Sequence, residues 1–354
     1  MRDIKEIIEY LRAYDGPELK FMEVCGTHTA AIFKSGIRSL ISPKIHLISG
    51  PGCPVCVTPT AYIDRLLEYG RRENHVICSF GDMLKVPGSG CSLSEAKGEG
   101  VNVRMIYSPP DVADMAEKER DKTFVMAAVG FETTAPAYAL MLKESKGRGI
   151  DNIRLVTALK RVIPALSWIC ENEEGIDGFI CPGHVSTIIG SDIYAPLAER
   201  YKKPFVVAGF EAEHLLAAIY DLVRCAEKGE ARADNLYTSG VRSEGNIKAL
   251  ALIDEYFETG DAVWRGLGRI PESGYYLREE FAGFDGGSRG LDSDSELPEA
   301  CRCADVIVGR ISPDMCPMFG NACRPETPYG PCMVSAEGAC GIWFRNSKGT
   351  GKQI

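Results

Sequence analysis

Apolar residues in the first two thirds of the chain occur in short runs, and most runs are followed by a segment with helical spacing. The runs predict eight strands, at residues 19–24, 44–49, 75–80, 103–107, 123–129, 153–158, 177–181 and 204–208. Amphipathic segments between them, such as residues 60–69 and 211–228, predict helices. Strands that alternate with helices form βαβ units, in which helices cover both faces of a parallel sheet. The pattern therefore predicts an α/β fold.

Eight strands are too many for one small sheet, so we expect two α/β modules. The length of 354 residues also favours more than one domain. The sequence Gly-Phe-Glu occurs at residues 130–132 and again at 209–211, each time between a strand and a helix, which favours two related modules. We place the first domain at residues 19–145 and the second at 146–235, with the boundary in the polar segment 143–152.

The pattern changes after residue 235. Residues 243–259 predict one further helix, whereas the polar, glycine-rich residues 283–298 predict a mobile connection. Residues 301–354 have little periodicity but contain six cysteines, so a bound metal cluster would be needed to order them. We therefore expect a smaller, mostly helical or irregular iron–sulfur domain at residues 236–354. An amphipathic helix within residues 1–18 is expected to pack against it.

Composition and charge narrow the class of protein. The chain is 45% hydrophobic and 25% charged, which is ordinary for a globular protein. Its net charge of -9 argues against a nucleic-acid partner, because binding to phosphates needs a basic face. No apolar run is long enough to span a membrane, and the N-terminus lacks the apolar core of a signal peptide. We expect a cytoplasmic location and no membrane partner.

The chain contains 14 cysteines. In a long chain without a signal peptide, so many cysteines indicate metal binding or thiol chemistry rather than a disulfide framework. Four of them lie within apolar strands or helices and are expected to be plain buried residues: Cys78, Cys170, Cys181 and Cys225.

The first candidate motif is Cys25-Gly-Thr-His28, which follows the predicted strand 19–24 and precedes a helix. This position favours a thiolate, because free backbone N–H groups and the helix dipole stabilise negative charge. His28 could orient or protonate a group bound at the sulfur. A buried cysteine followed by a helix-capping threonine explains these residues equally well.

The second motif is Gly50-Pro-Gly-Cys53-Pro-Val-Cys56, which follows the predicted strand 44–49. A Cys-x-x-Cys at a strand-to-helix turn is typical of redox dithiols, where it forms a reversible disulfide, and it also chelates metals. Ligands of open parallel sheets bind beyond the strand carboxyl ends, so Cys25, Cys53 and Cys56 are expected to converge on one cleft. Three thiols and the imidazole of His28 suit iron, zinc or copper(I), and a partner protein would have to complete the ligand set.

The third constellation consists of four cysteines separated by six, eight and seven residues: Cys316, Cys323, Cys332 and Cys340. Prolines and glycines lie between them, so the chain could wrap around a compact centre. The paired Cys-x-x-Cys knuckles of structural zinc sites are absent, which favours a [4Fe–4S] cluster over zinc. Cys301 and Cys303 form a Cys-x-Cys that could replace one of these ligands.

Nine segments of the chain resemble the HypD family of [NiFe]-hydrogenase maturation proteins. They are residues 25–29 (CGTHT), 49–56 (SGPGCPVC), 80–88 (FGDMLKVPG), 130–134 (GFETT), 182–186 (PGHVS), 244–246 (EGN), 264–268 (WRGLG), 332–335 (CMVS) and 337–340 (EGAC). The first two together are specific. One departure is residues 209–214, where the family tends to have proline after the glutamate and aspartate later.

The resemblance implies two αβα domains facing a cleft and a third domain that holds a [4Fe–4S] cluster. It also implies a scaffold with redox activity rather than a turnover enzyme. With the chaperone HypC, such a protein carries an iron that acquires cyanide and carbon monoxide. The cyanide comes from HypE, with HypF acting upstream.

On this resemblance, Cys25 would be a ligand of that iron. Cys53 and Cys56 would be a redox pair beside it, and possible further ligands. The cluster that feeds electrons to the pair would be held by Cys316, Cys323, Cys332 and Cys340.

Two other functions remain open from the residues alone. A cluster-dependent thiol–disulfide oxidoreductase would need Cys53 and Cys56 but would give no role to Cys25 and His28. A protein that uses the C-terminal cysteines for a structural zinc ion is the third alternative.

Overall fold

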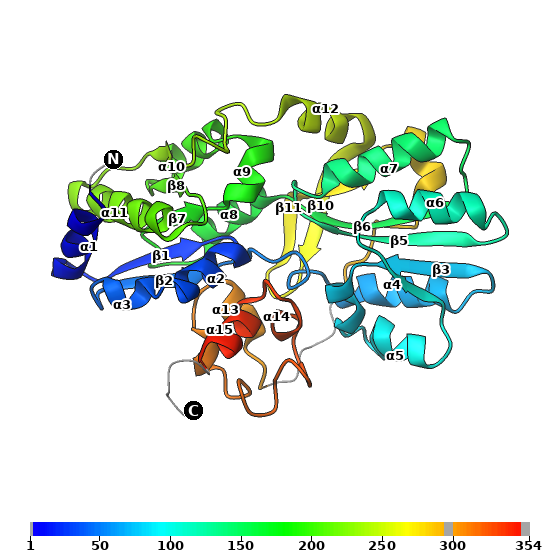
Figure 1. Cartoon of the computed structure of the whole chain (residues 1–354), viewed down its shortest axis with the longest axis horizontal. Coiled ribbons are helices and arrows are strands. Elements are labelled where there is room, and N and C mark those ends of the chain that lie inside the picture. The colour runs from blue at the N-terminus through cyan, green and yellow to red at the C-terminus, as the bar shows by residue number, and fades with distance from the viewer. Residues whose placement is uncertain (1–2, 294–299, 348–354) are drawn as a thin grey trace.

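The computed structural model describes residues 3–293 and 300–347 of the chain. Two α/β units lie side by side along the longest axis, and residues 300–347, here called the C-terminal segment, pack below them (Figure 1). No helix within this described part of the chain is long and apolar enough to cross a membrane.

The first unit is built on sheet A, a parallel sheet of five strands in the order β2-β1-β7-β8-β9. Its strands are β1 (Leu19–Glu23), β2 (Ile45–Ser49), β7 (Gly178–Cys181), β8 (Phe205–Val207) and β9 (Ala233–Asn235). One face is covered by α1 (Ile4–Ala13), α2 (Gly26–Lys34), α3 (Ile37–Leu40) and α11 (Ala212–Lys228). The other is covered by α8 (Val162–Asn172), α9 (Gly183–Ile189) and α10 (Ala195–Tyr201).

The second unit is built on sheet B, with six strands in the order β10-β11-β6-β5-β3-β4. Its strands are β3 (His75–Ser79), β4 (Val103–Met105), β5 (Thr123–Gly130), β6 (Ile153–Lys160), β10 (Phe257–Trp264) and β11 (Gly268–Leu277). Helices α4 (Thr60–Gly70) and α5 (Leu93–Gly98) cover one face. Helices α6 (Pro110–Lys118), α7 (Ala135–Gly147) and α12 (Ile247–Tyr256) cover the other. Both units are therefore αβα layers, and each of the eight predicted strands is confirmed.

The strand order divides the chain differently from the expected boundary at residues 143–152. Strand β6 pairs with β5, whereas β1 pairs with β2 on one side and with β7 on the other. Sheet A thus combines residues 19–49 with 178–235, and sheet B combines residues 75–160 with 257–277. Periodicity identifies strands but not their partners, and this is why the linear division into 19–145 and 146–235 does not match the two sheets.

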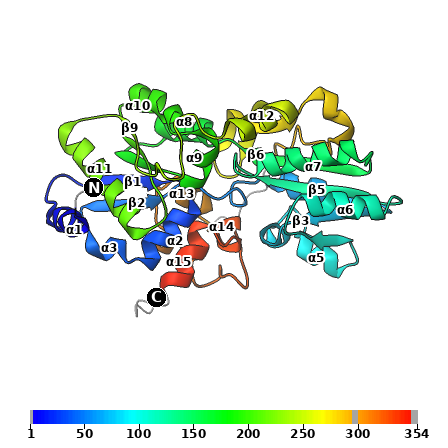
Figure 2. The ribbon, with the colours of Figure 1, turned by 45° about the horizontal axis from the view of Figure 1, so that its top comes forward.

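The chain crosses between the units three times, after β2, after β6 and after β9. Each crossing leaves from the carboxyl end of a parallel strand. The carboxyl ends of the two sheets therefore face each other at the junction, which both views place near the middle of the molecule (Figures 1 and 2). This junction is where ligands of parallel sheets are expected.

The N-terminal helix does not pack on the C-terminal segment as expected. Helix α1 lies against α11 of the first unit, where the rings of Tyr10 and Tyr220 are 4.9 Å apart. Its buried residues Ile7 and Leu11 join the apolar cluster on one face of sheet A. An apolar stripe shows that a helix is amphipathic but not which surface it covers.

The helix expected at residues 243–259 is shorter, because α12 ends at Tyr256 and the chain continues directly as β10. The hairpin of β10 and β11 was not predicted. Residues 283–293 of the expected mobile connection are anchored, with Gly286 donating to the carbonyl of Leu155 at 2.9 Å. The rest of that connection, residues 294–298, lies outside the described residues.

The C-terminal segment contains only short helices, as expected from its weak periodicity: α13 (Cys303–Ile307), η4 (Pro313–Met315), α14 (Pro331–Val334) and α15 (Ala339–Ser347). It contacts both units. A Cβ at Gly309 would lie 2.6 Å from Ile48 of β2, and Asp82 of the second unit accepts hydrogen bonds from Ser335 and Ala336 at 3.1 and 3.2 Å. The segment therefore bridges the two α/β units.

Candidate metal and thiol site

The Cys25 and Cys53 motifs touch each other at the carboxyl edge of sheet A. Strands β1 and β2 are parallel neighbours that end in register, with Glu23 beside Ser49. Gly50 then donates to the carbonyl of Glu23 at 2.8 Å. A Cβ at Gly52 would lie 2.4 Å from the backbone nitrogen of Cys25, so only glycine allows the two loops to approach this closely. The predicted convergence of these two motifs follows from this pairing.

A buried carboxylate, Glu23, connects the two motifs. It is 1% exposed and accepts hydrogen bonds from the backbone N–H of Cys25 at 3.2 Å and from the hydroxyl of Thr29. The Thr29 hydroxyl also lies 3.4 Å from that of Ser49 at the end of β2. Burial raises the pKa of Glu23 to about 7, although the hydrogen bonds from Thr29 and Ser49 partly oppose the shift. Glu23 was not predicted as a site residue. An acidic side chain inside an otherwise apolar strand is the sequence feature that could have identified it.

Cys25 is the N-cap residue of α2, so it lies at a helix N-terminus as expected. The expected thiolate is wrong for the protein without a bound metal. Burial raises the pKa of Cys25 to about 11, and the backbone N–H groups of His28 and Thr27 only partly oppose this. The stabilisation that the helix N-terminus gives to a thiolate is smaller than the cost of removing water from around the sulfur. A positive ion bound there would be needed to hold the thiolate.

His28 is fully buried beside the end of β8. Its Nε2 lies 3.2 Å from the carbonyl oxygen of Ala208, to which it can only donate, and its ring centroid is 4.9 Å from that of Phe210. Burial lowers the pKa of His28 to about 4. The neutral ring then carries its lone pair on Nδ1, which is buried and has no partner among the described residues. His28 can therefore accept a hydrogen bond or bind a metal, but it is a poor proton donor near neutral pH.

Cys53 and Cys56 are joined by a disulfide between β2 and α4. Their Cα atoms are 5.3 Å apart, and the two residues are only 4% and 2% exposed. The loop is held from the second unit by Arg265, whose backbone N–H donates to Val57 at 2.8 Å and whose guanidinium donates to Thr60 at 2.6 Å. Arg265 was not predicted to support the loop, because its contacts with Val57 and Thr60 join distant parts of the chain.

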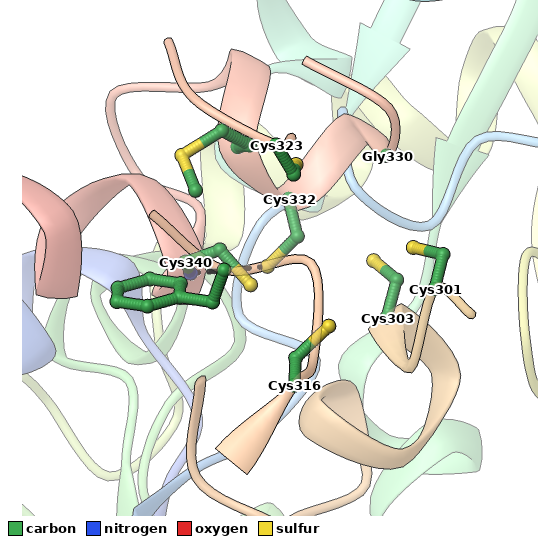
Figure 3. A pocket seen from close by; sticks show the side chains of 9 residues that line it. Cys301, Cys303, Cys316, Cys323, Gly330, Cys332 and Cys340 are labelled. Atoms are coloured by element: carbon green, nitrogen blue, oxygen red, sulfur yellow. Dashed lines mark hydrogen bonds between the residues drawn. The ribbon is translucent and has the colours of Figure 1, made fainter. Parts of the chain in front are cut away.

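The four predicted cluster cysteines line one cavity in the C-terminal segment, together with Cys301 and Cys303 (Figure 3). Phe319, Gly330 and Met333 form the rest of the lining. Backbone N–H groups point at two of the sulfurs, from Cys340 to Cys332 and from Tyr329 to Cys323, both at 3.4 Å. An apolar cavity with several thiols and N–H donors fits an iron–sulfur cluster, whose sulfurs accept such hydrogen bonds.

The disulfide and the cysteine cavity adjoin each other. A small pocket is lined by Cys53 and Cys56 on one side and by Cys332, Ile307 and Glu337 on the other. The sulfur of Cys56 also lies 3.9 Å from the carbonyl oxygen of Pro331, the residue before Cys332. The second and third thiol constellations are thus neighbours, although more than 270 residues separate Cys56 from Pro331 in sequence.

The second unit also reaches this region. Tyr194 of the first unit is fully buried, and burial raises the pKa of its phenol. Glu132 follows β5 and accepts a hydrogen bond from the backbone N–H of Val162, at the start of α8, at 2.9 Å. Of the four cysteines expected to be plain core residues, Cys78, Cys181 and Cys225 are buried and Cys170 is partly buried.

Nearly the whole chain is similar to a known protein family. Residues 2–347 match the HypD family, described as the hydrogenase formation hypA family. The chain is 43% identical to the hydrogenase maturation factor HypD of Azotobacter vinelandii over 337 residues, which cover 92% of this chain and 89% of the relative. It is 42% identical to the hydrogenase expression/formation protein HupD of Azotobacter chroococcum, with the same coverage. Identity to the HypD of Escherichia coli is 39% over 354 residues, covering 97% of this chain and 95% of the relative. The chain therefore belongs to the HypD family of hydrogenase maturation factors.

Proposed function

We propose that this protein is a scaffold on which the Fe(CN)2CO unit of a [NiFe]-hydrogenase is assembled. In this proposal Cys25 binds the iron cargo, and Cys53 and Cys56 act as a redox pair and as possible further ligands. Cys316, Cys323, Cys332 and Cys340 hold a [4Fe–4S] cluster. Family membership supports the role in maturation, and the spatial order of the three thiol groups supports the division of labour.

One observation carries the proposal: the disulfide and Cys332 line the same pocket. A cluster bound in the cysteine cavity would supply electrons one at a time to the disulfide, at the side of the pocket that Cys332 lines. The Cys53–Cys56 disulfide accepts two electrons and two protons to give two thiols. Because the disulfide is almost completely buried, its route to solvent reductants is poor, and a cluster bound in the neighbouring cavity would be the accessible source.

The dithiol can then release cyanide from a thiocyanate carried by a partner protein. Two electrons break the bond between sulfur and the cyanide carbon, which gives the partner's thiolate and free cyanide. Cys53 and Cys56 supply these electrons, lose their protons and return to the disulfide. The cyanide passes to the iron at Cys25. The lone pair on Nδ1 of His28, on the same sheet edge, is available to accept a hydrogen bond during this exchange.

Cys25, Cys53 and Cys56 are too few thiols to complete the ligands of the iron. A partner protein is therefore needed to supply the others. We propose a small HypC-like chaperone whose own cysteine supplies a further sulfur, and a HypE-like protein, with HypF upstream, that delivers the cyanide. The net charge of -9 supports protein partners rather than nucleic acid. We propose that this assembly takes place in the cytoplasm.

The burial of the disulfide argues against a general thiol–disulfide oxidoreductase. Cys53 and Cys56 are 4% and 2% exposed, so the disulfide of another folded protein has no direct access to them. A thiocyanate is a much smaller group, and a flexible chain end could carry it into the junction.

Infrared spectroscopy of the anaerobically purified complex with a HypC-like protein tests the proposal. We expect bands of iron-bound cyanide and carbon monoxide in the wild-type complex and in a Cys170→Ala control, because Cys170 lines neither thiol pocket. Cys25→Ala should fold and keep the C-terminal cluster but lose these bands. Bands of full intensity in Cys25→Ala would place the iron elsewhere and refute the proposal.

A further inference from the structure

We propose that Cys301 and Cys303 form an entry site for the iron–sulfur cluster: they bind incoming iron and pass it to the four resident cysteines. This inference rests on the proposed cluster site. It assigns a function to the two thiols of the cavity that would not be ligands of a [4Fe–4S] cluster.

The first argument is the number and position of the thiols. All six cysteines line one cavity, whereas a [4Fe–4S] cluster takes one protein thiolate for each iron, so two thiols are in excess. A Cβ at Gly330 would lie 3.3 Å from the sulfur of Cys301 and 3.5 Å from that of Cys303, so both sulfurs lie against the same short piece of backbone. Figure 3 shows the two side by side at one edge of the cavity.

The second argument is the exposure of Cys301. Cys301 is partly exposed, whereas the other five cysteines of the cavity are buried. Cys303 is 3% exposed and lies beside Cys301 at the same edge of the cavity (Figure 3). Cys301 is therefore the thiol of the cavity that incoming iron reaches most easily, and Cys303 lies beside it as a second ligand.

The position of Cys301 and Cys303 at the edge of the cavity allows the cluster to enter by ligand exchange. At each step a new sulfur–iron bond forms as the incoming thiol loses its proton, and an old sulfur–iron bond breaks as the leaving thiolate gains one. No electron is transferred, and the number of iron–sulfur bonds stays constant. Cys301 and Cys303 bind first, and the four resident cysteines then replace them.

An entry site differs measurably from a resident ligand and from plain packing. An entry site binds the cluster only transiently. Its loss therefore slows cluster loading and cluster removal by the same factor and leaves the final occupancy unchanged. Loss of a resident ligand lowers the final occupancy. Loss of a packing residue changes neither the rates nor the occupancy.

The experiment uses the full-length protein freed of metal and reloaded anaerobically with ferrous iron and sulfide. Visible absorption follows loading, and a chelator then follows removal. The variants are Cys301→Ser, Cys303→Ser and the double variant. Cys170→Ser is the control outside the cavity, and Cys316→Ala is the reference for a lost resident ligand.

We expect the double variant to load and to lose the cluster at least about tenfold more slowly, with the iron content of wild type at the end. Loading at the wild-type rate would overturn the inference, because the two thiols would then only pack. A lower final iron content would also overturn it, because Cys301 or Cys303 would be a resident ligand. Wild-type protein that takes up no cluster would instead refute the proposed function. This outcome is seen in the wild-type measurement alone, without the variants.

Discussion

The two thiol regions of this protein are built in opposite ways. At the edge of sheet A, Cys25, Cys53 and Cys56 are placed by paired strands, by glycines in close contact and by the buried carboxylate of Glu23. The cysteine cavity of the C-terminal segment has no sheet, only short helices. There the cysteines themselves, with Phe319 and Met333, form the centre of the structure.

The difference indicates which thiols affect folding and which affect chemistry. Ligands on a regular sheet are positioned before any metal binds, so removing one changes the chemistry and leaves the fold intact. Ligands in a segment with a small apolar core add the free energy of metal binding to the free energy of folding. Substitutions should therefore separate the two regions clearly.

The largest effect is expected at the C-terminal cysteines. Alanine in place of Cys316, Cys323, Cys332 or Cys340 should remove the cluster iron and its visible absorption and make the C-terminal segment sensitive to protease. The α/β units should resist protease as in wild type, and Cys170→Ala should behave as wild type. Iron and colour that survive all four single replacements would show that the cluster assignment is wrong.

The next largest effect is expected at Gly52. In Gly52→Ala the new Cβ would lie 2.4 Å from the nitrogen and 2.6 Å from the Cα of Cys25. The backbone must move, which should lower the free energy of unfolding by about 3 kcal/mol. Gly147→Ala at the end of α7 is the matched control, since nothing lies within 4 Å of its Cβ; it should stabilise by up to about 1 kcal/mol. Equal unfolding midpoints for the two variants would contradict the close contact of the two motifs.

A smaller effect is expected from the pH dependence of Glu132. Burial raises the pKa of Glu132 from 4.5 to about 7. Between these values the folded state holds a proton that the unfolded state has lost, so the stability contributed by Glu132 is present below pH 4.5 and falls as the pH rises through 7. Glu132→Gln cannot titrate, so it should gain up to about 3 kcal/mol relative to wild type across this window. Chemical unfolding at a series of pH values measures this difference.

Glu99→Gln is the control for that series, because Glu99 is exposed. A constant difference between Glu132→Gln and wild type at every pH would show that Glu132 ionises normally in the folded protein.

The sequence predicted local features of the fold better than long-range ones. All eight predicted strands exist because periodicity and β-branched residues are local signals, and the contact of the Cys25 and Cys53 loops followed from consecutive parallel strands. The interleaved sheets were not predicted, because the pairing of β1 with β7 joins residues about 160 positions apart. The proximity of the disulfide to Cys332 was implied by the family resemblance and not by any local pattern, for the same reason.

One prediction about the site was wrong and one residue of the site was not predicted, because both depend on burial. The expected thiolate at Cys25 relied on the helix end, whereas the surrounding protein raises its pKa. Glu23 was overlooked because an acidic residue in a strand is usually at the surface, and only the folded structure places Thr29 and Cys25 around it.

The most direct test of the account is whether electrons reach the disulfide through the C-terminal cysteine cavity. Oxidised, cluster-loaded protein is mixed anaerobically with a one-electron reductant, and alkylation with mass spectrometry then reports free thiols at Cys53 and Cys56. Cys316→Ala removes the cluster without touching the disulfide pocket, because Cys316 lines only the cysteine cavity. We predict rapid labelling of both thiols in wild type and in Cys170→Ala, and blocked thiols in Cys316→Ala over the same time. Equal labelling rates in wild type and Cys316→Ala would contradict the account.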